Sequence, residues 1–132
     1  MEEKLKAHFL NLYHMALSDT EIDTRELEML YLIGEEKGIT KTEINSVVLA
    51  PDTIKFVAPE TILEKIGYLY DFARIAWADG RIDENEKRLL KMFSEKFEFV
   101  KENIPSIVQF LLDEAQKDTP KEEVFKIVNE NL

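Results

Sequence analysis

The sequence predicts an all-α fold of six to eight helices, arranged as a single domain over residues 1–132. Apolar residues recur at steps of three and four in every long segment, which is the period of a helix buried on one face. Three candidate helix starts carry capping pairs, and no segment shows the alternation that a strand requires. The length of 132 residues suits one domain with a real core.

In the first half of the chain we expect three helices. The first helix has an apolar stripe formed by Leu5, Phe9, Leu12 and Ala16. The second should run over residues 24–37, where Gly38 supplies a C-terminal stop. Thr40 and Glu43 form a capping-box pattern for a short third helix, which Pro51 ends. The following stretch, "PDTIKFVAP", is a connector with room for one helical turn.

The second half predicts a buried central helix and three more. Pro59 and Glu60 should open the central helix, which continues to about Ala78 and carries apolar residues on more than one face. Asp83 should open the next helix, and residues 104–116 form another. The run Thr119-Pro120-Lys121-Glu122 has the pattern of an N-cap, an N1 proline and a capping glutamate for a last helix.

An internal repeat is the most informative feature of the sequence. The stretch "LSDTEID" near the end of the first helix returns sixty residues later as "WADGRID". The identical pairs are Ala16/Ala76, Asp19/Asp79, Ile22/Ile82, Asp23/Asp83, Glu26/Glu86 and Leu30/Leu90. The repeat predicts two helix–turn–helix units, each with an open apolar face, packed about a pseudo-twofold axis.

Helix capping explains only part of this repeated motif. The second aspartate of each copy is a good N-cap and the glutamate three residues later its capping-box partner. The first aspartate of each copy, Asp19 or Asp79, lies at a helix end where a negative charge costs stability. Three compensations remain open: a bound cation, a neighbouring Arg or Lys, or an Asx-turn hydrogen bond.

For a cation, the candidate ligands are the six carboxylates of the two copies. They are Asp19, Asp23, Glu26, Asp79, Asp83 and Glu86. An EF-hand is excluded, because its first and third ligand positions would fall on Ile75 and Trp77. A different oxygen site, built from carboxylates and helix-end carbonyls, would suit Ca²⁺ or Mg²⁺. His8 and His14 are a weak ligand pair, expected at the edge of the apolar stripe or in solvent.

Composition narrows the class of partner. There are 27 acidic and 17 basic residues, a net charge of −10, so nucleic acid and anionic membrane surfaces are disfavoured and a cation or a basic protein face is favoured. No apolar run is long enough to insert into a membrane, and the absence of cysteine fits a cytoplasmic protein. No catalytic motif is present, so we expect no enzyme activity.

"IAWADGRIDENEKRLL" and its weaker copy "MALSDTEIDTRELEML" resemble the TerB-like domain of tellurite-resistance proteins. The same fold is similar to the N-terminal region of DjlA-type co-chaperones. The resemblance covers roughly residues 3–98 and implies divalent-cation binding at the acidic residues of both copies, together with protein docking in stress-linked assemblies. The alternative is a metal-free helical adaptor whose acidic face binds a basic protein partner, with the motif serving only as a cap.

Overall fold

The computed structural model describes residues 1–17 and 24–131, and within these residues it contains seven α-helices and no strand. This confirms the predicted all-α class. The helices are α1 (Glu3–Ala16), α2 (Thr24–Glu36), α3 (Lys41–Leu49), α4 (Ile62–Trp77), α5 (Glu84–Lys96), α6 (Ile104–Gln116) and α7 (Lys121–Glu130), with short 3₁₀ turns at Pro51–Thr53 and Lys101–Asn103. None of these helices combines the length and the apolar character that crossing a membrane requires, within the residues described.

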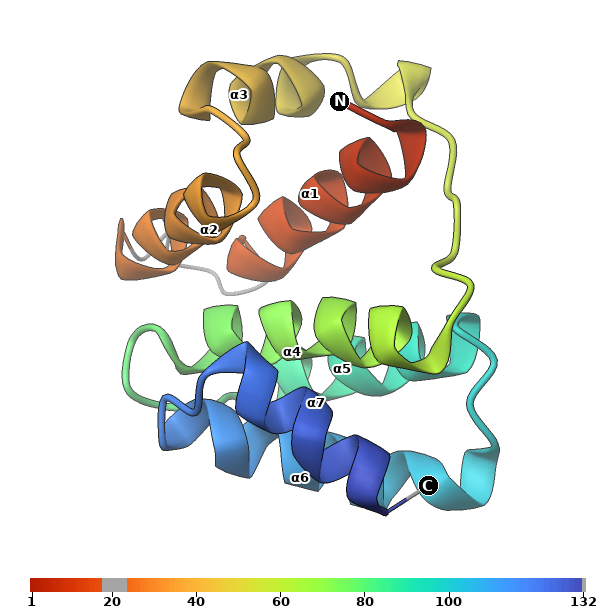
Figure 1. Cartoon of the computed structure of the whole chain (residues 1–132). Helices are drawn as coiled ribbons and strands as arrows, with labels where there is room; N and C mark the ends of the chain where they lie inside the picture. Colours follow the sequence, from red (N-terminus) through yellow and green to blue (C-terminus); the bar gives the residue numbers. More distant parts are fainter. Residues whose placement is uncertain (18–23, 132) are drawn as a thin grey trace.

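Helix α4 is the centre of the architecture. It contacts α1 and α2 on one side and α5, α6 and α7 on the other (Figure 1). Its side chains are buried around much of its circumference, from Ile66 to Ala76, as the sequence predicted for a central helix. Helix α3 packs on α1 and α2, away from α4, and a long connector then runs down one side of the molecule to α4 (Figure 1).

Two helix starts differ from the sequence prediction. Helix α4 begins at Ile62 and not at Pro59, because the Thr61 hydroxyl caps it by accepting a hydrogen bond from the Glu64 amide. Helix α7 has Pro120 as its N-cap and no capping side chain. The Thr119 hydroxyl, expected to cap α7, donates instead to the Glu114 carboxylate at 2.9 Å.

The two repeat units have matching environments. Counterparts sixty residues apart share the same burial: Phe9/Leu69, Leu12/Phe72, Met15/Ile75, Ala16/Ala76, Glu26/Glu86 and Leu30/Leu90 are all at most 1 % exposed. His8 and its counterpart Tyr68 stack on each other with ring centroids 3.9 Å apart. A residue that touches its own counterpart marks where an approximate twofold axis passes between the units.

The second helix of each unit ends in the same way. The amide of Ile39 donates to the Gly34 carbonyl, and sixty residues later the amide of Phe99 donates to the Ser94 carbonyl. Both ends turn through a left-handed residue, which is Gly38 (φ 74°) in the first copy and Glu98 (φ 67°) in the second. Glycine adopts this conformation without strain, whereas a residue with a Cβ does not.

Glu98→Gly should therefore stabilise the protein. A non-glycine residue in the left-handed region destabilises the folded state by about 1–2 kcal/mol. Glycine removes this strain, but its greater flexibility stabilises the unfolded chain and offsets part of the improvement. We expect a net increase of about 0.5–1 kcal/mol in the free energy of unfolding by urea titration. Glu95→Gly, an exposed position inside α5, is the control and should lose about 1 kcal/mol. A loss at both positions would contradict the prediction.

Candidate functional site

Asp79 stands at the turn between α4 and α5, and its side chain is only 5 % exposed. One carboxylate oxygen accepts a hydrogen bond from the Arg81 amide at 3.1 Å, which is an Asx turn. The other oxygen lies 4.0 Å from the Arg81 guanidinium, whose side chain is exposed. Two of the three compensations left open by the sequence are thus present together, and Gly80 completes the turn with φ 85°.

Asp83 and Glu86 form the predicted capping box at the start of α5. The Asp83 carboxylate accepts from the Glu86 amide at 2.8 Å, and the Glu86 carboxyl accepts from the Asp83 amide at 3.2 Å. Each side chain uses one of its two carboxyl oxygens in the capping box. The remaining oxygens, Asp83 Oδ2 and Glu86 Oε2, are buried and have no hydrogen-bond partner among the described residues. Capping therefore accounts for half of the oxygen atoms in this pair.

Glu86 is unusual for a capping residue because it is almost fully buried, at 1 % exposure. Burial raises the pKa of its carboxyl to about 9, and the charges of Glu26, Asp83 and Asp79 raise it further, against the hydrogen bond from the Asp83 backbone. The influence of Glu26 is informative because Glu26 is the counterpart of Glu86. The charge of Glu26 thus acts from the first unit on its own counterpart in the second.

The structure describes only part of the first copy of the motif. Asp19 and Asp23 lie outside the described residues, whereas Glu26 is 1 % exposed in the first turn of α2. Over the described ranges 1–17 and 24–131, no group of three or more His, Asp or Glu side chains is placed to hold a metal ion. Glu26, Asp79, Asp83 and Glu86, the four motif carboxylates that are described, therefore do not form a complete metal site.

Comparison with known proteins adds no assignment. The chain matches no family model, no curated protein and no solved structure. Its function must be argued from its own residues.

A second polar centre, which the sequence did not predict, lies inside the fold. Asp71, in the middle of α4, is fully buried and accepts hydrogen bonds from His8 at 2.9 Å and from Lys121 at 2.7 Å. The Lys37 ammonium lies 3.4 Å from the same carboxylate. Four elements, α1, the end of α2, α4 and the start of α7, are thereby tied to one charge.

The ionisation of this centre follows from its surroundings. Burial opposes the charge on Asp71, yet the His8 hydrogen bond and the two lysines hold the pKa of this carboxyl below its usual range. Burial lowers the pKa of His8, so its imidazole is neutral and donates through Nε2. The expectation that His8 lies at the stripe edge or in solvent is wrong, because His8 is 3 % exposed; His14 is exposed as expected. A charged residue inside the helix predicted to be central and buried was the available signal.

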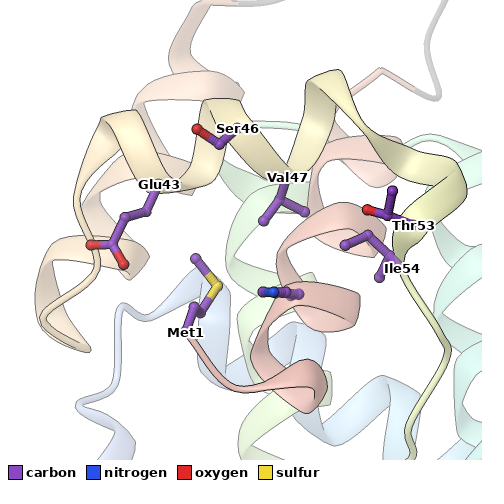
Figure 2. Close-up of a pocket in the computed structure, with 7 residues that line it drawn as sticks. Met1, Glu43, Ser46, Val47, Thr53 and Ile54 are labelled. Atoms are coloured by element: carbon purple, nitrogen blue, oxygen red, sulfur yellow. The ribbon is translucent and has the colours of Figure 1, made fainter.

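Two hollows flank these centres. A small one, of about 260 Å³, is lined by Met1, Glu43, Ser46, Val47 and Ile54 between the N-terminus and α3 (Figure 2). Its titratable lining residues are Lys6 and Glu43. A larger groove of about 700 Å³ runs between α4, α6 and α7 and is lined mainly by apolar side chains, among them Ile66, Phe99, Val100, Ile107 and Phe110.

Proposed function

We propose that this chain is a non-enzymatic, TerB-like cytoplasmic module that binds a divalent cation, Ca²⁺ or Mg²⁺, between its duplicated acidic turns and docks partner proteins in a stress-linked assembly. The observation that carries the proposal is the buried Glu86 carboxyl, whose ionisation is opposed by burial and by the charges of Glu26, Asp83 and Asp79. A buried carboxylate in such surroundings requires a compensating positive charge. A proton or a cation can supply that charge.

The chemistry of the available oxygen atoms supports a cation. Asp83 Oδ2 and Glu86 Oε2 are buried without a hydrogen-bond partner among the described residues, and hard cations take carboxylate oxygens as ligands. Because the four described carboxylates alone are incomplete, the proposed ligand set also includes Asp19 and Asp23 and draws on both copies: Asp19, Asp23, Glu26, Asp79, Asp83 and Glu86. The cation would join the two units where they meet.

The docking part of the proposal is supported by the apolar groove between α4, α6 and α7. Two large apolar side chains at this groove, Ile62 and Val100, are 46 % and 59 % exposed. Exposed apolar surface of this kind often marks a place where another protein binds. The groove lies on the C-terminal helices, so docking there would leave the acidic turns free. With a net charge of −10, we expect a protein partner and no nucleic acid.

Calorimetric titration of the chelator-treated protein with Ca²⁺ and Mg²⁺ tests the cation part. We expect binding of one of the two ions and a rise in melting temperature, because a ligand that binds only the folded state stabilises it. Asp79→Asn should abolish both effects while retaining the Asx turn, which asparagine also forms. Glu84→Gln removes the same charge from an exposed position in α5 and is the matched control. Equal binding by parent and Asp79→Asn would remove Asp79 from the site.

The alternative, a metal-free adaptor with an acidic docking face, is favoured by a different observation. The Asx turn at Asp79 and the capping box of Asp83 and Glu86 give each residue a role without any ion. On this alternative, neither ion binds, and the Glu86 carboxyl keeps its proton. Absence of calcium and magnesium binding in the titration would therefore select the adaptor.

A further inference from the structure

A third hollow, of about 750 Å³, lies where the end of α2 and the middle of α4 face the start of α7. Met29, Leu32 and Tyr70 contribute an apolar wall. The charged residues of its lining are Glu36, Lys37, Arg74, Asp118, Lys121 and Glu122. It is separate from the acidic turns, and the function proposed above makes no use of it.

Two lysines of this hollow compete for one carboxylate. Lys37 and Lys121 both pair with Asp71, and their side chains are only 23 % and 22 % exposed. Burial lowers the pKa of His8, so its imidazole is neutral and does not change the balance of charge. Two ammonium groups against one carboxylate leave an excess of one positive charge in a poorly hydrated place, where an uncompensated charge is costly.

Lys121 also shows this excess of positive charge, because its surroundings oppose its charged form. Burial lowers the pKa of the Lys121 ammonium, and the neighbouring Lys37 lowers it further, although Asp71 acts in the opposite direction. Lys121 is also the first residue of α7, a helix whose N-terminus has no side-chain cap. The positive end of the helix dipole thus adds to the field of the two lysines.

The acidic residues of the lining do not cancel this field. Glu36 is engaged by Arg74 in two hydrogen bonds, of 2.7 and 3.0 Å. Asp118 and Glu122 are exposed on the rim, where water screens them. They would repel a large polyanion, so the hollow favours a small ligand with a single anionic head.

We propose that this hollow binds a small molecule through an oxyanion, a phosphate or carboxylate group, held by Lys37, Lys121 and the backbone amides of Lys121 and Glu122, with the rest of the ligand against Met29, Leu32 and Tyr70. The oxyanion supplies the negative charge that Asp71 alone does not. Arg74, held in place by Glu36, borders the same space and limits the size of the head group.

The test is a titration of the full chain with inorganic phosphate and, separately, with succinate, at constant ionic strength in chloride. We expect saturable shifts of the backbone amide signals of Lys121 and Glu122 in NMR spectra. Lys37→Gln should weaken binding roughly ten- to a hundredfold, the loss typical of one hydrogen bond to a charged group. In this variant Asp71 keeps its His8 and Lys121 partners, so folding is preserved.

Two further variants keep the result interpretable. Lys126→Gln makes the same charge change on an exposed part of α7 and should leave binding unchanged. Asp118→Asn removes a rim carboxylate and should tighten it. Tighter binding of phosphate identifies a phosphorylated ligand, and tighter binding of succinate a carboxylic acid. Shifts that do not saturate with either anion, or that weaken equally in Lys37→Gln and Lys126→Gln, would overturn the proposal.

Discussion

Asp71→Ala should reduce the free energy of unfolding by roughly 3–5 kcal/mol, the range found when one partner of a buried ion pair is removed. The variant leaves the Lys37 and Lys121 ammonium groups without a carboxylate and takes the hydrogen-bond acceptor from His8. Because both lysine side chains are about one-fifth exposed, they can turn towards water, so we expect the lower part of this range. Urea denaturation at neutral pH measures the loss.

The matched control for this variant is Asp113→Ala, at an exposed position of α6 whose carboxylate accepts a hydrogen bond from the Gln109 amide. Its effect should stay within about 0.5 kcal/mol. The effect of Asp71 should also depend on pH. Since its folded pKa is depressed, its contribution is complete above the ordinary value of 3.8 and is lost as the pH falls below that value. A loss under about 1 kcal/mol at neutral pH would mean that Asp71 does not hold the four elements together.

Glu86→Gln should change the free energy of unfolding in the opposite direction and make the metal-free protein more stable at alkaline pH. In the folded protein the carboxyl keeps its proton up to a pKa of about 9, whereas the unfolded chain releases it near 4.5. The folded state therefore binds more protons between these values, and its stability falls as the pH rises through them. Glutamine keeps the capping hydrogen bond and has no proton to lose. At pH 8 we expect a gain of roughly 1–3 kcal/mol over the parent.

This second prediction is measured by urea denaturation between pH 4 and pH 9 in the presence of a chelator. The curves of parent and variant should meet near pH 4 and separate as the pH rises. Glu84→Gln, the exposed neighbour, should run parallel to the parent throughout. His8 does not confuse the comparison, because its depressed pKa limits its influence to pH values below about 6.5. Parallel curves for Glu86→Gln would show that its carboxyl is ionised in the folded protein.

The helices and the repeat were predictable because both are local. Apolar spacing, capping pairs and Gly38 act within a few residues, and the structure has helices wherever these patterns were found. The predicted start of α7 was wrong because the competitor for the Thr119 hydroxyl, Glu114, belongs to the preceding helix. A sequence pattern does not show whether a side chain will cap the next helix or form a hydrogen bond with a different helix.

In the candidate site, too, the local features were predictable from the sequence and the contacts between helices were not. The capping box of Asp83 and Glu86 follows from spacing alone and is present as predicted. The depth at which Glu86 is buried, and the influence of Glu26 on its carboxyl, depend on how the two units pack. The Asp71 centre was missed entirely because its partners come from α1, α2 and α7, with Lys121 fifty residues away. Spacing within one helix carries no information about such contacts.

The stacked pair of His8 and Tyr68 also bears on how such a chain could have arisen. If each unit descends from one ancestral hairpin, that hairpin would have covered its open face by pairing with a second copy, and every residue on the axis would have faced itself. Glu26 and Glu86, counterparts that are equally buried, preserve that ancestral arrangement. Asp71 does not, because its counterpart is the uncharged Asn11. Joining the copies in one gene would have allowed the two sides of the axis to diverge, so that a single buried carboxylate could appear where a symmetric pair would have brought two.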